Sequence, residues 1–145
     1  MKSVSGLLAC LLIFSSCEEE IPCTSFMIGE PVEIPFGRTV THCTEPISVT
    51  FLDLISDSRC PIGATCIWAG MVEVRISVNL NGQEEVFNLS SAPNFGNKVP
   101  NIQTIEGYSV ELVDLKPFPD TSKKVDEKDR QVVLLIKKVG SGLKE

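Results

Sequence analysis

The chain has few of the side chains that most often carry out catalysis. It contains one histidine, one tryptophan and one tyrosine. A serine or cysteine nucleophile needs a base beside it, but the single His42 is followed by Cys43, which we expect to be oxidised, so we interpret His42 as an exposed loop residue. Glycine-rich phosphate loops and calcium-loop patterns do not occur either. We therefore expect no enzymatic activity, no catalytic residue and no cofactor.

Carboxylates are plentiful, so a pair of them is weak evidence for catalysis. Asp53 and Asp57 lie near each other in the sequence, and a glycosidase needs two carboxylates close together in space. Alternation along a strand puts two such residues on one face by chance. We interpret Asp57 instead as a turn residue, whose carboxylate accepts a hydrogen bond from the backbone amide of Arg59 or Cys60.

Positive charge is also in short supply. After residues 1–16 the chain holds twelve Lys and Arg residues against nineteen Asp and Glu residues, a net charge of −7. Nucleic acids and anionic lipid surfaces bind through basic patches. The composition therefore predicts no nucleic-acid partner and no attachment to anionic lipid through charge.

Hydrophobic runs long enough to span a bilayer are absent from the sequence. The apolar run at residues 7–14 follows Lys2 and is too short to cross a membrane, which is typical of a secretory signal peptide. Residues 14–17, with the sequence FSSC, resemble a bacterial lipobox in which Phe14 replaces the usual leucine. The resemblance implies cleavage before Cys17 and lipidation of its sulfur. An ordinary signal peptide with an incidental cysteine is the alternative.

Lipidation would make residues 1–16 a signal peptide and residues 17–26 a lipidated tether. Several acyl chains on one residue give a stable membrane anchor. The acidic run at residues 18–20 is either a solvated spacer or similar to the export signal that directs some lipoproteins to the cell surface. We therefore expect an outer-membrane lipoprotein that faces either the periplasm or the outside of the cell.

Four cysteines remain once Cys10 leaves with the signal peptide and Cys17 carries lipid. In an oxidising compartment they are expected to form two disulfides, for which three pairings are possible. We predict the pairs Cys60–Cys66 and Cys23–Cys43. The competing interpretation is a zinc site, which the spacing does not favour because it lacks a two-residue knuckle. Its ligands would be His42, Cys43, Cys60 and Cys66.

Residues 57–70, with the sequence DSRCPIGATCIWAG, are the most distinctive part of the chain. Pro61 and Gly63 suit a type I turn over residues 60–63, which would bring the two cysteines within reach of each other. We expect Trp68 to bury its ring beside the disulfide. One interpretation is a structural corner between two strands. The other is a rigid binding loop that presents Asp57, Ser58 and Arg59, with Trp68 nearby.

The same segment resembles a group of small lipoproteins of the Bacteroidetes, in which DSRCP is followed by CIWAG. The likeness covers residues 54–78 well and the later strands loosely. It implies an envelope location and a β fold. It transfers no catalytic residue.

Alternating apolar and polar residues predict strands throughout the rest of the chain. Residues 72–80 alternate without interruption and are followed by Asn81-Gly82, a strong signal for a type I′ hairpin. The alternation breaks at residues 52–55, which indicates a bulge or a strand buried on both faces. The predicted strands are residues 32–36, 39–43, 47–55, 72–80, 84–89, 102–105, 108–113 and 131–139.

Seven or eight short strands without crossover helices predict an all-β fold. We expect a single antiparallel β-sandwich, immunoglobulin-like, over residues 27–139, followed by a flexible C-terminus at residues 140–145. A small β-barrel is the alternative. The immunoglobulin likeness is loose, because the predicted Cys60–Cys66 bridge is local and does not join two sheets.

Three functional hypotheses remain. The first is a lipid-anchored binding module that presents its disulfide-locked loop to a protein or glycan partner. The second is an envelope inhibitor of a protease or lysozyme, in which Arg59 would enter an acidic specificity pocket. The third is a purely structural envelope lipoprotein. A long turn-rich segment at residues 90–101 is a second loop of the kind that often carries binding.

Overall fold

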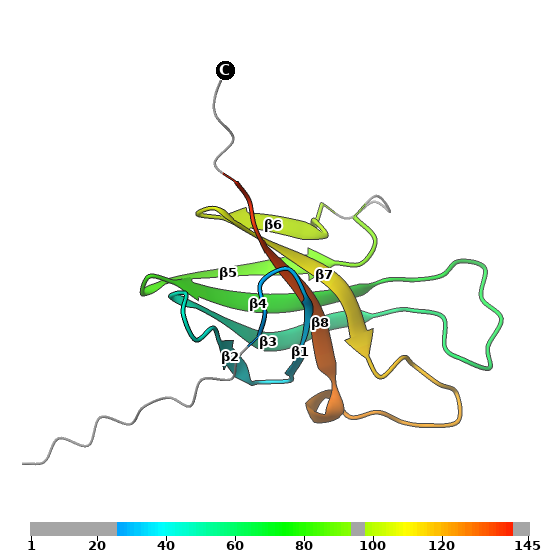
Figure 1. Ribbon diagram of the computed structural model, residues 1–145. Coiled ribbons are helices and arrows are strands. Elements are labelled where there is room, and N and C mark those ends of the chain that lie inside the picture. The colour runs from blue at the N-terminus through cyan, green and yellow to red at the C-terminus, as the bar shows by residue number, and fades with distance from the viewer. Residues whose placement is uncertain (1–25, 94–97, 141–145) are drawn as a thin grey trace, which may run out of the picture.

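Eight strands form two antiparallel four-stranded sheets in the computed structural model, which describes residues 26–93 and 98–140 (Figure 1). The predicted signal peptide, the predicted lipidation site Cys17 and the cysteine Cys23 lie outside the described residues. So do residues 141–145. The strands are β1 Pro31–Pro35, β2 Thr39–Thr41, β3 Ile47–Asp57, β4 Val72–Leu80, β5 Gln83–Ser90, β6 Ile102–Ile105, β7 Tyr108–Lys116 and β8 Gln131–Lys138.

Both sheets are built mainly from strands that are consecutive in the chain, and only β1 joins its sheet from a distant part of the sequence. The first sheet has the order β1-β8-β7-β6, and the second has the order β2-β3-β4-β5. The two sheets pack face to face and do not close into a barrel, which confirms the predicted β-sandwich. The strand order differs from that of immunoglobulin domains. In those domains the first, second, fifth and fourth strands form one sheet, and the third, sixth and seventh form the other.

Strand β4 shows why these residues form strands. Its five alternate apolar residues are each at most 4% exposed, while the residues between them point to the other face. The hairpin to β5 turns through Asn81 and Gly82, whose φ angles are 53° and 83°. Positive φ at both central residues is the requirement of a type I′ turn, so the hairpin prediction is confirmed.

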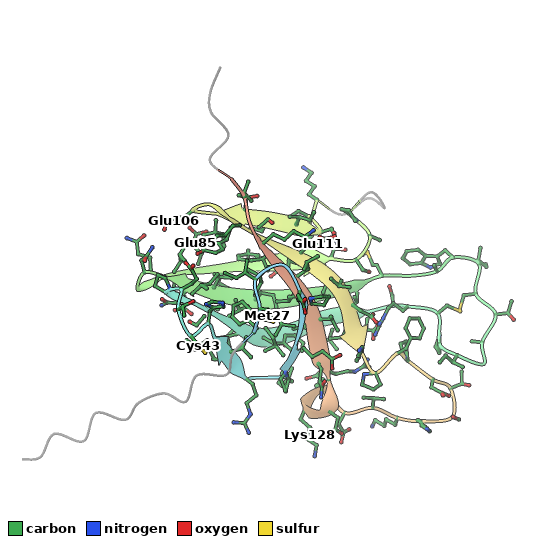
Figure 2. All side chains as sticks on the ribbon, viewed as in Figure 1. Met27, Cys43, Glu85, Glu106, Glu111 and Lys128 are labelled. Atoms are coloured by element: carbon green, nitrogen blue, oxygen red, sulfur yellow. A yellow bond between two sulfur atoms is a disulfide. The ribbon has the colours of Figure 1, made fainter. Side chains whose placement is uncertain are left out.

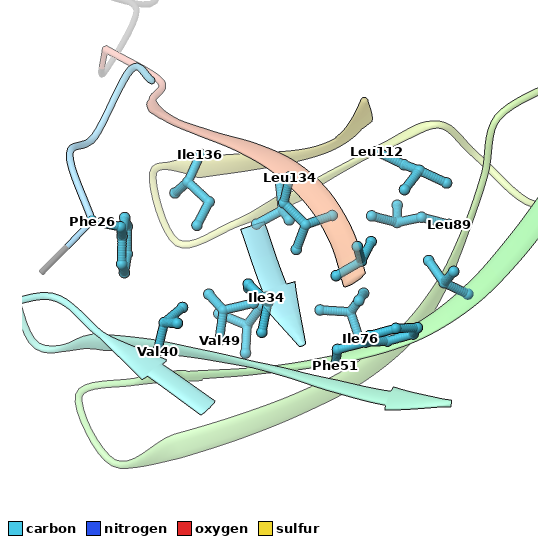
Figure 3. Packing of buried hydrophobic residues seen from close by; sticks show 14 of the residues in the cluster. Phe26, Ile34, Val40, Val49, Phe51, Ile76, Leu89, Leu112, Leu134 and Ile136 are labelled. Atoms are coloured by element: carbon cyan, nitrogen blue, oxygen red, sulfur yellow. The ribbon is translucent and has the colours of Figure 1, made fainter. Parts of the chain in front are cut away.

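The core lies between the two sheets and draws on both of them (Figure 3). Phe51 of β3, Ile76 of β4 and Leu134 of β8 have no exposed surface. The ring of Phe36 meets that of Phe51 edge to face, with 5.3 Å between the ring centroids. Strand β8 lies between β1 and β7, so its apolar residues occupy a central strand.

The broken alternation in β3 corresponds to two irregularities in its pairing with β4. The register shifts between Phe51 and Asp53 and again between Leu54 and Ser56. A bulge of this kind bends its strand and re-aims the residues beyond it. The prediction of a bulge is confirmed, and β3 continues to Asp57, two residues further than expected.

The described residues contain almost no helix. The single helical element among them is the 3₁₀-helix η1, Glu127–Asp129. In residues 26–93 and 98–140, no helix has the length and hydrophobicity needed to cross a membrane.

Truncation of Phe51 tests the core. We expect Phe51→Ala to lower the free energy of unfolding by about 3–5 kcal/mol, because the change opens a cavity between the sheets. Val86 of β5 is 55% exposed, so Val86→Ala is the control and should change stability by no more than about 0.5 kcal/mol. Urea denaturation of both variants measures the difference. Equal stabilities would contradict the described core.

Candidate binding loop

The segment between β3 and β4 projects beyond the sandwich as a long hairpin (Figure 1). We call residues 58–71 the disulfide loop. Strand pairing continues into its base, because the amide of Ser58 donates to the Met71 carbonyl at 2.8 Å and the amide of Cys60 donates to the Ala69 carbonyl at 2.9 Å. The Ser58 hydroxyl also accepts a hydrogen bond from the Met71 amide at 3.1 Å.

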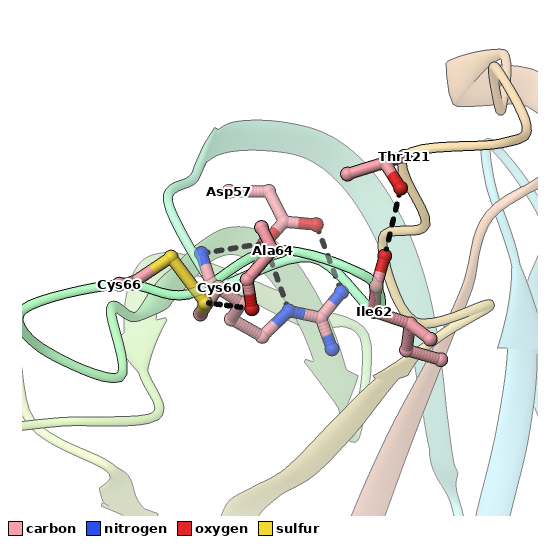
Figure 4. The surroundings of a disulfide bond; sticks show 7 residues. Asp57, Cys60, Ile62, Ala64, Cys66 and Thr121 are labelled. Carbon is pink, nitrogen blue, oxygen red and sulfur yellow. Dashed lines mark hydrogen bonds and ion pairs between the residues drawn. A yellow bond between two sulfur atoms is a disulfide. The ribbon is translucent and has the colours of Figure 1, made fainter.

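A disulfide closes the outer part of this loop (Figure 4). Cys60 and Cys66 are bonded, with 5.9 Å between their Cα atoms, which confirms the predicted pair. The turn inside the ring lies one residue later than expected, because the Ala64 amide donates to the Pro61 carbonyl at 3.1 Å. Gly63 then takes the third place of the turn with φ +86°, a conformation that glycine adopts without strain.

Arg59 and Asp57 form a buried, two-pronged ion pair at the base of the loop. The Arg59 Nε donates to Asp57 Oδ1 and its Nη2 donates to Asp57 Oδ2, each at 2.8 Å (Figure 4). Their side chains are only 6% and 7% exposed. The Arg59 amide also donates to Asp57 Oδ1 at 3.3 Å, so the predicted turn hydrogen bond is confirmed.

The same guanidinium group joins the loop to the opposite sheet. Its Nη1 donates to the carboxylate of Asp114 at 3.1 Å and to the carbonyl of Leu115 at 2.8 Å, both in β7. The guanidinium carbon lies 4.6 Å from the centre of the Phe118 ring. One arginine from the β3–β4 loop thereby contacts β7 and the segment that follows it.

A second arginine shares the Asp57 carboxylate. Arg130, directly before β8, donates from Nη1 to Asp57 Oδ2 and to the Pro117 carbonyl, each at 3.0 Å. Burial by itself raises the pKa of the Asp57 carboxyl, but the hydrogen bonds and charge of Arg59, together with Arg130, outweigh it and hold that pKa below its ordinary value. We call Asp57, Arg59, Asp114 and Arg130 the arginine clasp.

The clasp overturns the interpretation of Asp57 and Arg59 as residues presented to a ligand. Both side chains are buried, and their hydrogen-bonding groups are occupied within the protein. The suggestion that Arg59 enters an acidic pocket of an enzyme is wrong for the same reason. Ser58 is exposed, but its hydroxyl bonds both polar backbone groups of Met71.

Trp68 is not the buried residue that the sequence predicted. It is 50% exposed, because the disulfide loop extends past the end of the two sheets (Figure 1). Ile62 is 60% exposed and Ile67 is fully exposed. We call Ile62, Ile67 and Trp68 the apolar tip. The signal that could have located it is the absence of charged residues between Arg59 and Glu73.

The loop is braced by a neighbouring segment from the β7–β8 connection. The Ile62 amide donates to the Pro119 carbonyl at 2.9 Å, and the Thr121 amide donates to the Ile62 carbonyl at 3.1 Å. Phe118 in this segment is 43% exposed. The sequence carries no signal of this support, because the two segments are nearly sixty residues apart.

The close approach of the two arms of the loop explains why position 70 is a glycine. A Cβ atom at Gly70 would lie 1.8 Å from the carbonyl oxygen of Ser58, and the residue has φ +74°. Any side chain there would separate the two arms of the loop. The close approach of the arms therefore requires glycine at this position.

The zinc alternative does not fit the described side chains. Cys60 and Cys66 are bonded to each other, so neither supplies a thiolate to zinc. His42 is half-buried and not fully exposed, and its Nδ1 accepts a hydrogen bond from the Glu45 amide at 3.0 Å. Cys43 is also disulfide-bonded, and its predicted partner Cys23 lies outside the described residues. In residues 26–93 and 98–140, no cluster of three potential ligands could hold a metal ion.

Asp53 and Asp57, which lie near each other in the sequence, have different surroundings in the structure. Asp53 faces Arg75 at 4.0 Å on the exposed surface, whereas Asp57 is held by the arginine clasp. Each carboxylate therefore has a guanidinium neighbour of its own.

Comparison with known proteins identifies no relative: no family model, curated protein or solved structure matches the chain. The geometry of the disulfide loop is therefore the basis for a proposal about function.

Removal of Arg59 tests the clasp. We expect Arg59→Met to lower the free energy of unfolding by about 3–5 kcal/mol, because Asp57 would stay buried without its main partner. Arg75→Met is the matched control, since Arg75 forms an exposed pair with Asp53, and its cost should stay below about 1 kcal/mol. Chemical denaturation compares them. Similar losses in both variants would show that the clasp adds little.

The lowered pKa of Asp57 predicts how stability depends on pH. A carboxylate whose pKa is depressed in the folded state stabilises the protein above its unfolded pKa of about 3.9, and this contribution disappears as pH falls through the folded value. We expect the stability gap between the native protein and Asp57→Asn to be widest near neutral pH and to narrow in acid. Unfolding measured from pH 7 to pH 2 tests this. A gap that stays constant would contradict it.

Proposed function

We propose that the protein is a lipid-anchored binding module of the cell envelope that presents its disulfide loop to a protein partner. The observation that carries this proposal is the combination of a loop fixed at its base with an exposed apolar tip. The arginine clasp and the disulfide hold the loop in shape. Large apolar side chains on a rigid protrusion are typical of binding surfaces.

The position of the first described residue supports a loop that is presented away from the anchored end of the domain. Phe26, the first described residue, packs against His42 with 5.2 Å between ring centroids, close to the start of β3. The disulfide loop follows the end of β3, whose eleven residues span about 33 Å when extended. The described chain therefore begins at the opposite end of the sandwich from the disulfide loop (Figure 1), so a lipid on Cys17 would be joined to the domain at that end.

A protein partner fits the loop better than a glycan does. Between Cys60 and Ala69 the side chains are apolar except for the hydroxyl of Thr65 and the indole N–H of Trp68. Sugar hydroxyl groups need hydrogen-bond partners when they lose water, and an unpaired polar group is costly. The loop offers few such partners, whereas apolar contact is what a protein surface can supply.

Inhibition of an envelope protease or lysozyme is the second candidate, because a locked loop loses little freedom when it docks. Such an inhibitor would act through the apolar tip, since Arg59 is buried. Assays of a panel of proteases and lysozymes with the purified protein distinguish the two. Inhibition would favour the second candidate, and recovery of a non-enzymatic partner would favour the first. Recovery of neither would leave a purely structural envelope lipoprotein.

Substitution of Cys17 tests the anchor. We expect Cys17→Ala to move the protein from the membrane fraction to the soluble fraction, because the acyl chains attach to that sulfur. Cys10→Ala removes another cysteine within the predicted signal peptide and should leave the protein in the membrane fraction. Fractionation and immunoblotting measure both, and whole-cell protease treatment separates surface display from the periplasm. Membrane recovery of both variants would refute the anchor.

A further inference from the structure

We infer that the apolar tip inserts into an uncharged, apolar cleft of a folded protein partner. This inference rests on the proposed binding function and adds the contact residues and the shape of the partner. The tip consists of Ile62, Ile67 and Trp68, as defined above. It does not include the charged residues of the motif, which the arginine clasp uses internally.

The chemistry of the tip selects an uncharged surface. No charged residue lies between Arg59 and Glu73. Asp120 lies beside Ile62 in the bracing segment, and its carboxylate accepts hydrogen bonds from the amide and the hydroxyl of Ser122. Glu85 and Glu106 lie at the other end of the sandwich (Figure 2). A charge in the partner that became buried against the tip would lose water without gaining a counter-charge, which is costly. The partner surface that fits the tip is therefore apolar.

The shape of the tip selects a concave surface. Stable protein interfaces use about 20–30 residues on each side, whereas the loop beyond its paired base is only residues 61–68. Two such tips in contact, as in a dimer of this chain, would bury too little surface. A narrow protrusion buries more of itself only when the partner surrounds it on several sides, as a cleft does.

The rigidity of the loop makes insertion favourable. The disulfide closes residues 60–66, and the hydrogen bonds of Ile62 to Pro119 and Thr121 brace the ring from outside. Pre-formed loops lose little conformational entropy on binding. Tryptophan is among the residues that most often dominate the binding energy of an interface. Trp68 and Ile67 are therefore the expected anchors.

Photocrosslinking locates the contact. A photoreactive amino acid is placed at position 67, or at position 86 as a control, in the full-length lipidated protein, which is then mixed with detergent-solubilised envelope proteins of the source cell. We expect a crosslinked protein from position 67 alone, with its crosslinked residues lining an apolar cleft. A flat or charged crosslinked surface, a dimer of this chain, or no product from position 67 would overturn the inference.

Affinity measurements with the identified partner separate the inference from the proposed function. Ile67→Glu and Trp68→Glu should each weaken binding by about 30-fold or more, the range of interface hot spots. Val86→Glu, at a similarly exposed position on β5, should change binding by less than about threefold. Binding that survives both tip substitutions would overturn the inference and leave the binding function standing. Failure to crosslink any partner from position 67 or position 86 would count against both the inference and the proposed binding function.

The fluorescence of Trp68 distinguishes a protein cleft from a lipid surface. Trp68 is the sole tryptophan, so the emission of the protein reports on the tip. We expect no blue shift when phosphatidylcholine vesicles are added to the full-length protein in which Cys17→Ala removes the lipid. A blue shift that Ile67→Glu abolishes would assign the tip to membrane insertion and overturn the inference.

Discussion

The buried pair of Asp57 and Arg59 is the interaction on which the shape of this molecule depends. Asp57 ends a strand of one sheet, and the guanidinium group that it holds reaches Asp114 and Leu115 in the other. Taking two charges out of water is expensive unless their hydrogen bonds are satisfied. A guanidinium group binds a carboxylate through two of its N–H groups and still has further N–H donors. The Arg59 side chain can therefore join the loop and both sheets.

This arrangement divides the distinctive segment into two parts with different roles. The charged residues at its start, which looked most like ligands, hold the loop in place. The uncharged residues that follow remain in contact with solvent, and among them are Ile67 and Trp68. Exposure, rather than chemical reactivity, marks the part of the loop available to a partner.

The strands were predictable because alternation is a local property. Residues 72–80 show inward and outward side chains directly, and Asn81-Gly82 fixes the hairpin that follows. The Cys60–Cys66 bridge was predictable too, since its two ends are six positions apart. The environments of Arg59 and Trp68 were not. Arg59 is buried by residues more than fifty positions away, and Trp68 is exposed because the sandwich ends before it, which no local pattern reveals.

The base of the disulfide loop and its outer turn are held by different groups of residues. Residues 57–60 and 69–71 supply the clasp and the pairing of the two arms, while Gly63 and Ile62 set the turn and its brace. Positions such as 64, 65 and 67 stand outside these supports. Their side chains can therefore be exchanged without refolding the body of the protein, so that one frame could be fitted to many different partners.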